Sequence, residues 1–128
     1  MGTCYSTLIE VQWPESGPEA RWSGEAFFEM GKSYELARCF PHKGWPRGEG
    51  SDHHGRLYHV SRAARVLHDK EFADSGLAWG TLAEIMDLYE KEMHDKEACD
   101  FPCCRAMLAA AKAFEDAGAN VRILIWGD

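Results

Sequence analysis

The chain has 128 residues, 45% of them hydrophobic and 27% charged, and a net charge of −7 at neutral pH. This length and composition predict one globular domain over 1–128 and exclude a disordered or collagen-like chain. No apolar run reaches the roughly 20 residues that a membrane-spanning helix needs. The five cysteines are an odd number, unsuited to a disulfide framework, and the start of the chain lacks a secretory pattern, so we expect a cytoplasmic protein.

Two strands are predicted in the N-terminal part of the chain. Residues 5–13 alternate in the pattern of a half-buried strand. The face expected to turn inward carries Tyr5, Thr7, Ile9, Val11 and Trp13. The turn-forming sequence PESGP at 14–18 predicts a hairpin, with a second strand over about 21–29.

A short helix is expected over 34–40, because Ser33 is a suitable N-cap and Pro41 stops the helix. A long basic loop over 39–60 comes next, with the aperiodic sequence HKGWPRGEGSDHHGRLYH at 42–59. Ser61 then predicts the start of another helix, of about eight to ten residues.

A helical hairpin is predicted over 81–117. Thr81 and Glu84 have the spacing of a capping box, which starts a helix over about 81–95. The second helix begins near Pro102, a residue favoured in a first turn, and ends before Gly118, a suitable C′ residue.

The last segment, 120–126, is apolar on both faces apart from Arg122, which predicts a central strand beside the N-terminal one. These elements together predict an α+β fold. We expect a small, mainly antiparallel sheet of three to four strands, with about four helices packed mostly on one face.

Five segments of the sequence are distinctive in combination: MGTCYSTLIEVQ, GKSYELARCF, WPRGEGSD, GTLAEI and VRILIWGD. They resemble a family of small phage and prophage proteins whose members begin MGTD, have a histidine two residues later, and end in VRI, hydrophobic residues, Trp and Asp. This chain has Cys4 and Ser6 where the family has Asp and His, and DSGLAWGTL lacks the family's HSH motif. The resemblance implies a phage or mobile-element protein in the host cytoplasm, where small acidic proteins often block host defences.

The charges are divided along the chain. Between 69 and 100, ten acidic residues oppose three lysines, a local net charge of −7 that equals the net charge of the whole chain. Between 38 and 65, six Lys or Arg residues oppose two acidic ones, a local net charge of +4. The chain therefore has an acidic and a basic part, each of which offers a candidate binding surface.

The acidic part predicts a surface that binds a protein partner. Its carboxylates could enter a cationic groove that otherwise holds nucleic acid phosphates, although a charged helix face is more often simply hydrated. The first hypothesis is therefore a non-catalytic, anti-CRISPR-like inhibitor that binds a host defence protein or complex. The residues in this set are Glu84, Asp87, Glu90, Glu92, Asp95, Glu97 and Asp100.

The basic part predicts, as an alternative, a phosphate or nucleotide site in a small binding protein or enzyme. Cationic side chains would hold the phosphate and the aromatic rings would stack on a base, unless those rings only anchor the loop to the core. The residues in this set are Lys43, Trp45, Arg47, Arg56, Tyr58, Arg62 and Arg65. No P-loop, dinucleotide-binding or serine-hydrolase motif occurs.

A zinc site is the third alternative, although the main expectation is that the protein binds no cofactor. Histidine and cysteine are the ligands that zinc prefers, but their spacing here is loose, and a cysteine at a helix start is often packed in a core. The residues in this set are His53, His54, His59, Cys99, Cys103 and Cys104.

Overall fold

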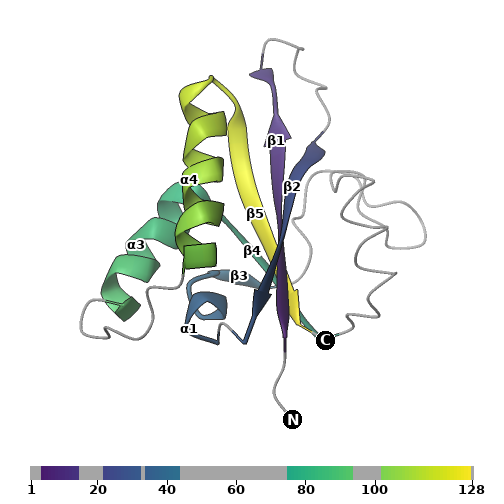
Figure 1. Ribbon diagram of the computed structural model, residues 1–128. Coiled ribbons are helices and arrows are strands. Elements are labelled where there is room, and N and C mark those ends of the chain that lie inside the picture. Colours follow the sequence, from purple (N-terminus) through teal and green to yellow (C-terminus); the bar gives the residue numbers. More distant parts are fainter. Residues whose placement is uncertain (1–3, 15–21, 33, 44–74, 94–101, 128) are drawn as a thin grey trace.

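The computed structural model describes residues 4–14, 22–32, 34–43, 75–93 and 102–127. In these residues, five strands form one sheet in the order β2-β1-β5-β4-β3, and every neighbouring pair is antiparallel. The strands are β1 (Tyr5–Gln12), β2 (Ser23–Gly31), β3 (His42–Lys43), β4 (Ser75–Thr81) and β5 (Asn120–Gly127). The helices are α1 (Tyr34–Ala37), α3 (Leu82–Met93) and α4 (Pro102–Asp116). Figure 1 shows all three on the same side of the sheet.

The predicted fold class was wrong in its numbers of strands and helices. The sheet has five strands instead of three to four, and the described residues contain two helices longer than one turn, α3 and α4, beside the four-residue α1. Strand β4, with the sequence SGLAWGT, has two glycines and no clear alternation, and β3 is only two residues long. Both strands are defined by pairing with neighbours distant in sequence. The helix expected after Ser61 and most of the loop over 39–60 lie outside the described residues.

The strongest patterns in the sequence were interpreted correctly. Strands β1 and β2 form the expected antiparallel hairpin. Strand β5 is the middle strand of the five and pairs with β1 along its full length, from Tyr5 opposite Gly127 to Gln12 opposite Asn120. Strands β1 and β5 are buried along almost their full lengths, whereas β2 is mostly exposed or half-buried, so the pairing places the most buried strands at the centre of the sheet.

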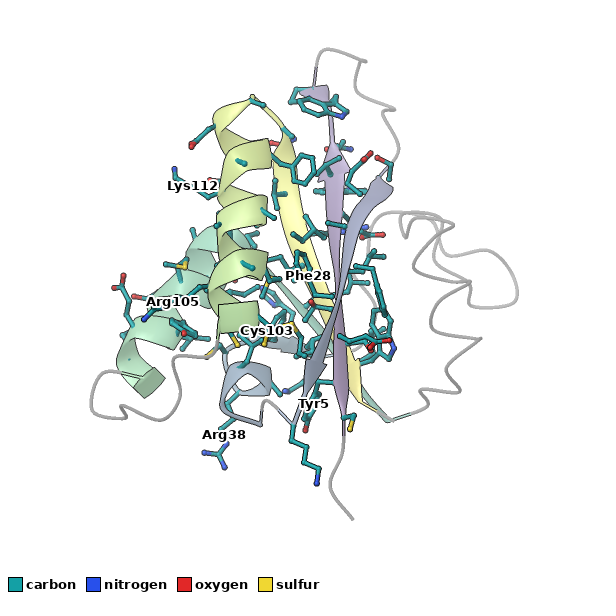
Figure 2. The ribbon with its side chains drawn as sticks, viewed as in Figure 1. Tyr5, Phe28, Arg38, Cys103, Arg105 and Lys112 are labelled. Atoms are coloured by element: carbon teal, nitrogen blue, oxygen red, sulfur yellow. The ribbon has the colours of Figure 1, made fainter. Side chains whose placement is uncertain are left out.

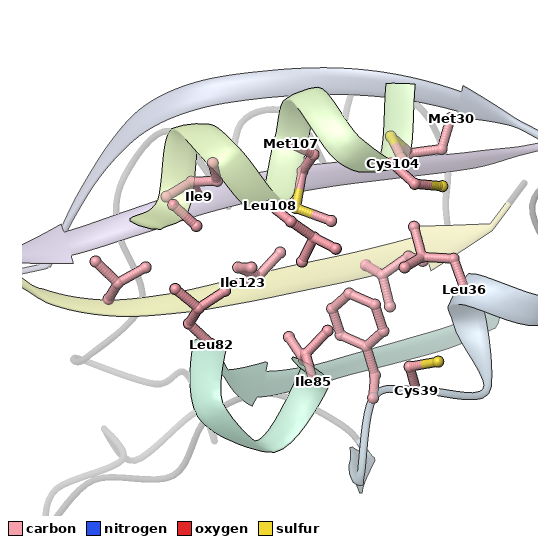
Figure 3. Packing of buried hydrophobic residues seen from close by; sticks show 14 of the residues in the cluster. Ile9, Met30, Leu36, Cys39, Leu82, Ile85, Cys104, Met107, Leu108 and Ile123 are labelled. Carbon is pink, nitrogen blue, oxygen red and sulfur yellow. The ribbon is translucent and has the colours of Figure 1, made fainter. Parts of the chain in front are cut away.

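The main core lies between the sheet and the helices. Ile9 of β1 and Ile123 of β5 are fully buried, and Ile85 of α3 and Met107 of α4 pack into the same cluster (Figure 3). Alternate residues of each strand and three- or four-residue steps along each helix supply these side chains. Each such side chain contributes roughly 1.5–3 kcal/mol on full burial, so this cluster stabilises the layered arrangement.

The ends of the two long helices follow from local sequence. At the start of α3, the amide of Glu84 donates to Thr81 Oγ1 (3.3 Å) and the amide of Thr81 donates to Glu84 Oε1 (3.0 Å), which confirms the capping box. At the end of α4, the amide of Gly118 donates to the carbonyl of Glu115 (2.9 Å) and the amide of Ala119 to that of Phe114 (3.1 Å). This is a Schellman motif, and Gly118 has the positive φ (100°) that the motif needs.

Gly80 marks a close approach of three elements. A Cβ atom at this position would lie 2.9 Å from Cδ of Pro41 and 3.0 Å from Cγ1 of Ile85. Only glycine therefore lets β4 lie this close both to the chain before β3 and to the first turn of α3. This packing fixes α3 against the β3 edge of the sheet.

The sheet face opposite the helices is also buried at its centre. Leu8, Leu124 and Trp126 are each no more than 2% exposed, although alternation places them on the other side from Ile9 and Ile123. Both faces of β1 and β5 are thus removed from water, so the prediction that β1 is only half-buried was wrong. Within the described ranges, no helix is both long enough and apolar enough to cross a membrane.

Candidate functional site

Helix α3 presents its acidic residues away from the core. Leu82 and Ile85 are buried, whereas Asp87 and Glu90 are exposed. The three-residue spacing of Glu84, Asp87 and Glu90 places these carboxylates on the side of the helix opposite the buried residues. The packing that holds α3 on the sheet therefore leaves its charged side outward.

Of the two long helices, α3 carries the negative charge. Its sequence LAEIMDLYEKEM has four acidic residues against one lysine, a net charge of −3, whereas α4 has two of each sign and a net charge of zero. Figure 2 shows Arg105 and Lys112 of α4 extending outward on the side of the sheet that carries the helices. Lys112 pairs with Asp116 at 3.0 Å, and on α3 Lys91 pairs with Asp87 at the same distance. Glu90 lies beside this second pair.

His42 joins the β3 edge to the first turn of α3. Its ring stacks on Trp79 of the paired strand β4, with centroids 4.4 Å apart, and its Nε2 lies 2.7 Å from Glu84 Oε2. The two side chains of the His42–Glu84 pair are 43% and 36% exposed. Because an ionised carboxylate only accepts hydrogen bonds, Nε2 is the donor in this pair. A carboxylate thus orients an imidazole at the surface.

Glu84 is held in its ionised form by its surroundings. The backbone amide of Thr81 lowers the pKa of this carboxyl below its ordinary value, partial burial opposes that shift, and the hydrogen bond from His42 lowers the pKa further. Two groups already occupy its oxygens, one on each. Glu84 therefore attaches α3 to the sheet edge, while Asp87 and Glu90 remain the more accessible carboxylates.

The other acidic candidates are only partly placed. Glu92 belongs to the last turn of α3, although its side chain is not among those described. Three further candidates lie outside the described residues: Asp95, Glu97 and Asp100. The described part of the predicted acidic surface is therefore the side of α3 that carries Asp87 and Glu90.

The basic set is represented by one residue. Lys43 is exposed on β3, next to His42. The remaining members of that set lie outside the described residues: Trp45, Arg47, Arg56, Tyr58, Arg62 and Arg65.

Two members of the set predicted to bind zinc lie in the described residues. Cys104 is fully buried in the core cluster and Cys103 is half-buried against it, in the first turn of α4. The other members lie outside the described residues: His53, His54, His59 and Cys99. Across the described ranges, no group of three or more His, Cys, Asp or Glu side chains could hold a metal ion.

A buried ion pair on the opposite face of the sheet was missed by the sequence analysis. Nε of Arg122 donates to Oε1 of Glu10 at 2.7 Å, with the two side chains 8% and 0% exposed, and the guanidinium lies 4.0 Å from the ring centre of Trp22. Burial lowers the pKa of Arg122 below its ordinary value, and the charge and hydrogen bond of Glu10 oppose this shift. The signal in the sequence was a single charged residue in each of two predicted strands, Glu10 in β1 and Arg122 in β5.

The two ends of the chain that carry the family resemblance lie together. Ser6 of β1 is opposite Trp126 of β5, and exposed Cys4 directly precedes β1. The positions at which this chain departs from the Asp and His of the resembling family are thus beside its C-terminal strand. No protein-family model, no curated protein and no solved structure matches the chain.

Proposed function

We propose that this chain is a non-catalytic inhibitor, encoded by a phage or mobile element, that binds a protein of a host defence system through the acidic side of α3. The observation that carries the proposal is the exposure of Asp87 and Glu90 on a helix with a net charge of −3, beside a helix of zero net charge. The phage context is supported by the resemblance of the chain ends.

The physical basis is electrostatic complementarity. A protein that binds nucleic acid has a cationic groove for the phosphates. Carboxylates held on a rigid helix can present negative charge to that groove without having to be ordered on binding. Helix α3 meets the need for rigidity, because Ile85 is in the core and the His42–Glu84 pair fixes its first turn. Such binding should weaken as salt increases, since exposed charges are screened.

The test is a charge reversal with a control matched in charge and helix context. The double variant Asp87→Lys, Glu90→Lys changes the net charge by +4 and removes the exposed ion pair with Lys91. The control Glu115→Lys, Asp116→Lys changes the charge equally and removes the equivalent pair with Lys112 on α4. Both variants therefore lose one i,i+4 ion pair, which stabilises a helix by only about 0.2–0.5 kcal/mol.

Each tagged protein is expressed in cells that carry candidate defence systems, and captured partners are identified and then titrated at low and high salt. We expect the α3 variant to bind its partner at least about tenfold more weakly, a loss of about 1.4 kcal/mol, and the α4 control to bind as the unmodified chain does. Equal binding by both variants, or equal loss by both, would contradict the assignment to α3. Bound nucleotide or zinc without a protein partner would instead favour the basic loop.

A further inference from the structure

Strand β2 forms one edge of the sheet and is nine residues long. It pairs with β1 on one side, and in the described part of the chain no backbone group pairs with the outer side of its central residues, 24–29. An edge of this length presents a row of peptide donors and acceptors that another extended chain can use.

The outward side chains of β2 form an acid–aromatic–acid row. Glu25, Phe27 and Glu29 are exposed, while Ala26 and Phe28 face the core cluster. Among the described side chains, Phe27 is the one large hydrophobic group that is exposed, at 36%, and its ring lies 6.3 Å from that of Trp126. Phe27 and Glu29 lie opposite Leu8 and Ser6 of β1 and are one two-residue step apart, roughly 7 Å. Glu25 lies at the irregularity in this pairing, between Gly24 and Ala26.

We propose that the outer edge of β2 binds an extended segment of a partner protein in which an apolar residue is flanked, two residues away on each side, by Lys or Arg. Backbone hydrogen bonds would extend the sheet, the apolar residue would cover Phe27, and each cation would lie opposite Glu25 or Glu29. Opposite charges directly across a strand pair are stabilising.

The charge pattern argues against a second copy of the chain as the occupant. Antiparallel pairing of two β2 strands about Phe27 would place Glu25 of one copy opposite Glu29 of the other. Like charges in that position destabilise a strand pair. The same glutamates that favour a cationic segment therefore oppose self-association in this register.

This surface is separate from the one on α3. Strand β2 lies at one edge of the sheet, whereas α3 is attached through His42 to β3 at the other edge (Figure 1). The two surfaces can thus fail or succeed independently in experiments.

The test uses two fluorescent nine-residue peptides that differ only in their central charges, one with Lys-Thr-Val-Thr-Lys and one with Glu-Thr-Val-Thr-Glu. Binding is measured by anisotropy, and hydrogen exchange locates the contact. We expect the lysine peptide to bind the full chain at least tenfold more tightly than the glutamate peptide and to protect the amides of β2. The variant Glu25→Lys, Glu29→Lys should reverse this preference, and Phe27→Thr should weaken the binding of the lysine peptide.

The α3 variant Asp87→Lys, Glu90→Lys serves as the control and should keep the preference for the lysine peptide. Three results would overturn the proposal: no binding of the lysine peptide, a preference that survives reversal of Glu25 and Glu29, or protection located outside β2. Protection without peptide of those β2 amides that point away from β1 would also overturn it, and its loss on dilution would identify a second copy as the occupant.

Discussion

Removing one partner of the buried pair between Glu10 and Arg122 should destabilise the protein severely. The two charged groups are joined at 2.7 Å, with side chains 0% and 8% exposed, so either charge left alone would lose its partner without gaining water. Breaking such a pair costs about 3–5 kcal/mol. Because a domain is stable by only about 5–15 kcal/mol, Glu10→Met or Arg122→Met should remove a large part of the total.

The double variant should lose much less stability than the sum of the losses in the two single variants. Glu10→Met with Arg122→Met replaces both charges by apolar side chains of similar size, which is often neutral or stabilising in other buried pairs. We expect the stability of this double variant to lie within about 1–2 kcal/mol of the unmodified chain. The physical reason is that most of the cost of a single change is the desolvation of the remaining charge.

The assay is urea unfolding at neutral pH, followed by tryptophan fluorescence and circular dichroism. The unfolding free energies of the four proteins give the interaction energy of the pair through a double-mutant cycle. If a single variant does not fold, that result agrees with the expected loss, and the double variant still gives a measurable free energy. Single changes that cost less than about 1 kcal/mol, or costs that simply add, would refute the reasoning.

Three further results are expected. Because the folded pKa of Glu84 lies below its ordinary value of 4.5, its contribution to stability is present above that pH and is lost as the pH falls through the folded pKa. Thus the stability difference between the unmodified chain and Glu84→Gln should shrink as the pH is lowered below 4.5, and a constant difference in unfolding titrations would contradict this. Gly80→Ala should cost about 1–3 kcal/mol through overpacking; an unchanged unfolding midpoint would show that its neighbours yield. In a Cys99→Ser background, a thiol reagent should label Cys4 rapidly and Cys39 and Cys104 only on unfolding, since the last two are 0% exposed; rapid labelling of either would place it outside the core.

Several features of the fold could be predicted because they depend on neighbouring residues. Alternation over 5–13 is enough to define β1 and its inward face, and the continuous apolar run before the C-terminus defines a central strand. The capping box joins Thr81 to Glu84, and the Schellman motif needs only Gly118 and the last turn of α4. In each case the hydrogen-bonding partners lie within a few positions in the sequence, so the local pattern contains the information.

The candidate binding surface on α3 could be predicted from the sequence only in part. The run of acidic residues from Glu84 to Asp100 predicted a charged surface, and the structure places Asp87 and Glu90 away from the core. That Glu84 is engaged by His42 was not predictable, because the two residues are 42 positions apart and meet only through β3. Because Glu84 is hydrogen-bonded to His42 while Asp87 and Glu90 are exposed, we expect Asp87 and Glu90 to contribute most to binding.

The sequence by itself determined the N-terminal hairpin, the pairing of the first and last strands and the charged side of α3, since periodicity and short-range capping encode them. Only the tertiary structure decided that the sheet has five strands and that Gly80 lies between Pro41 and Ile85. It also decided that Glu10 meets Arg122, a residue 112 positions away. The physical reason is that such contacts depend on strand register, which is set by the packing of the whole sheet and not by any short segment.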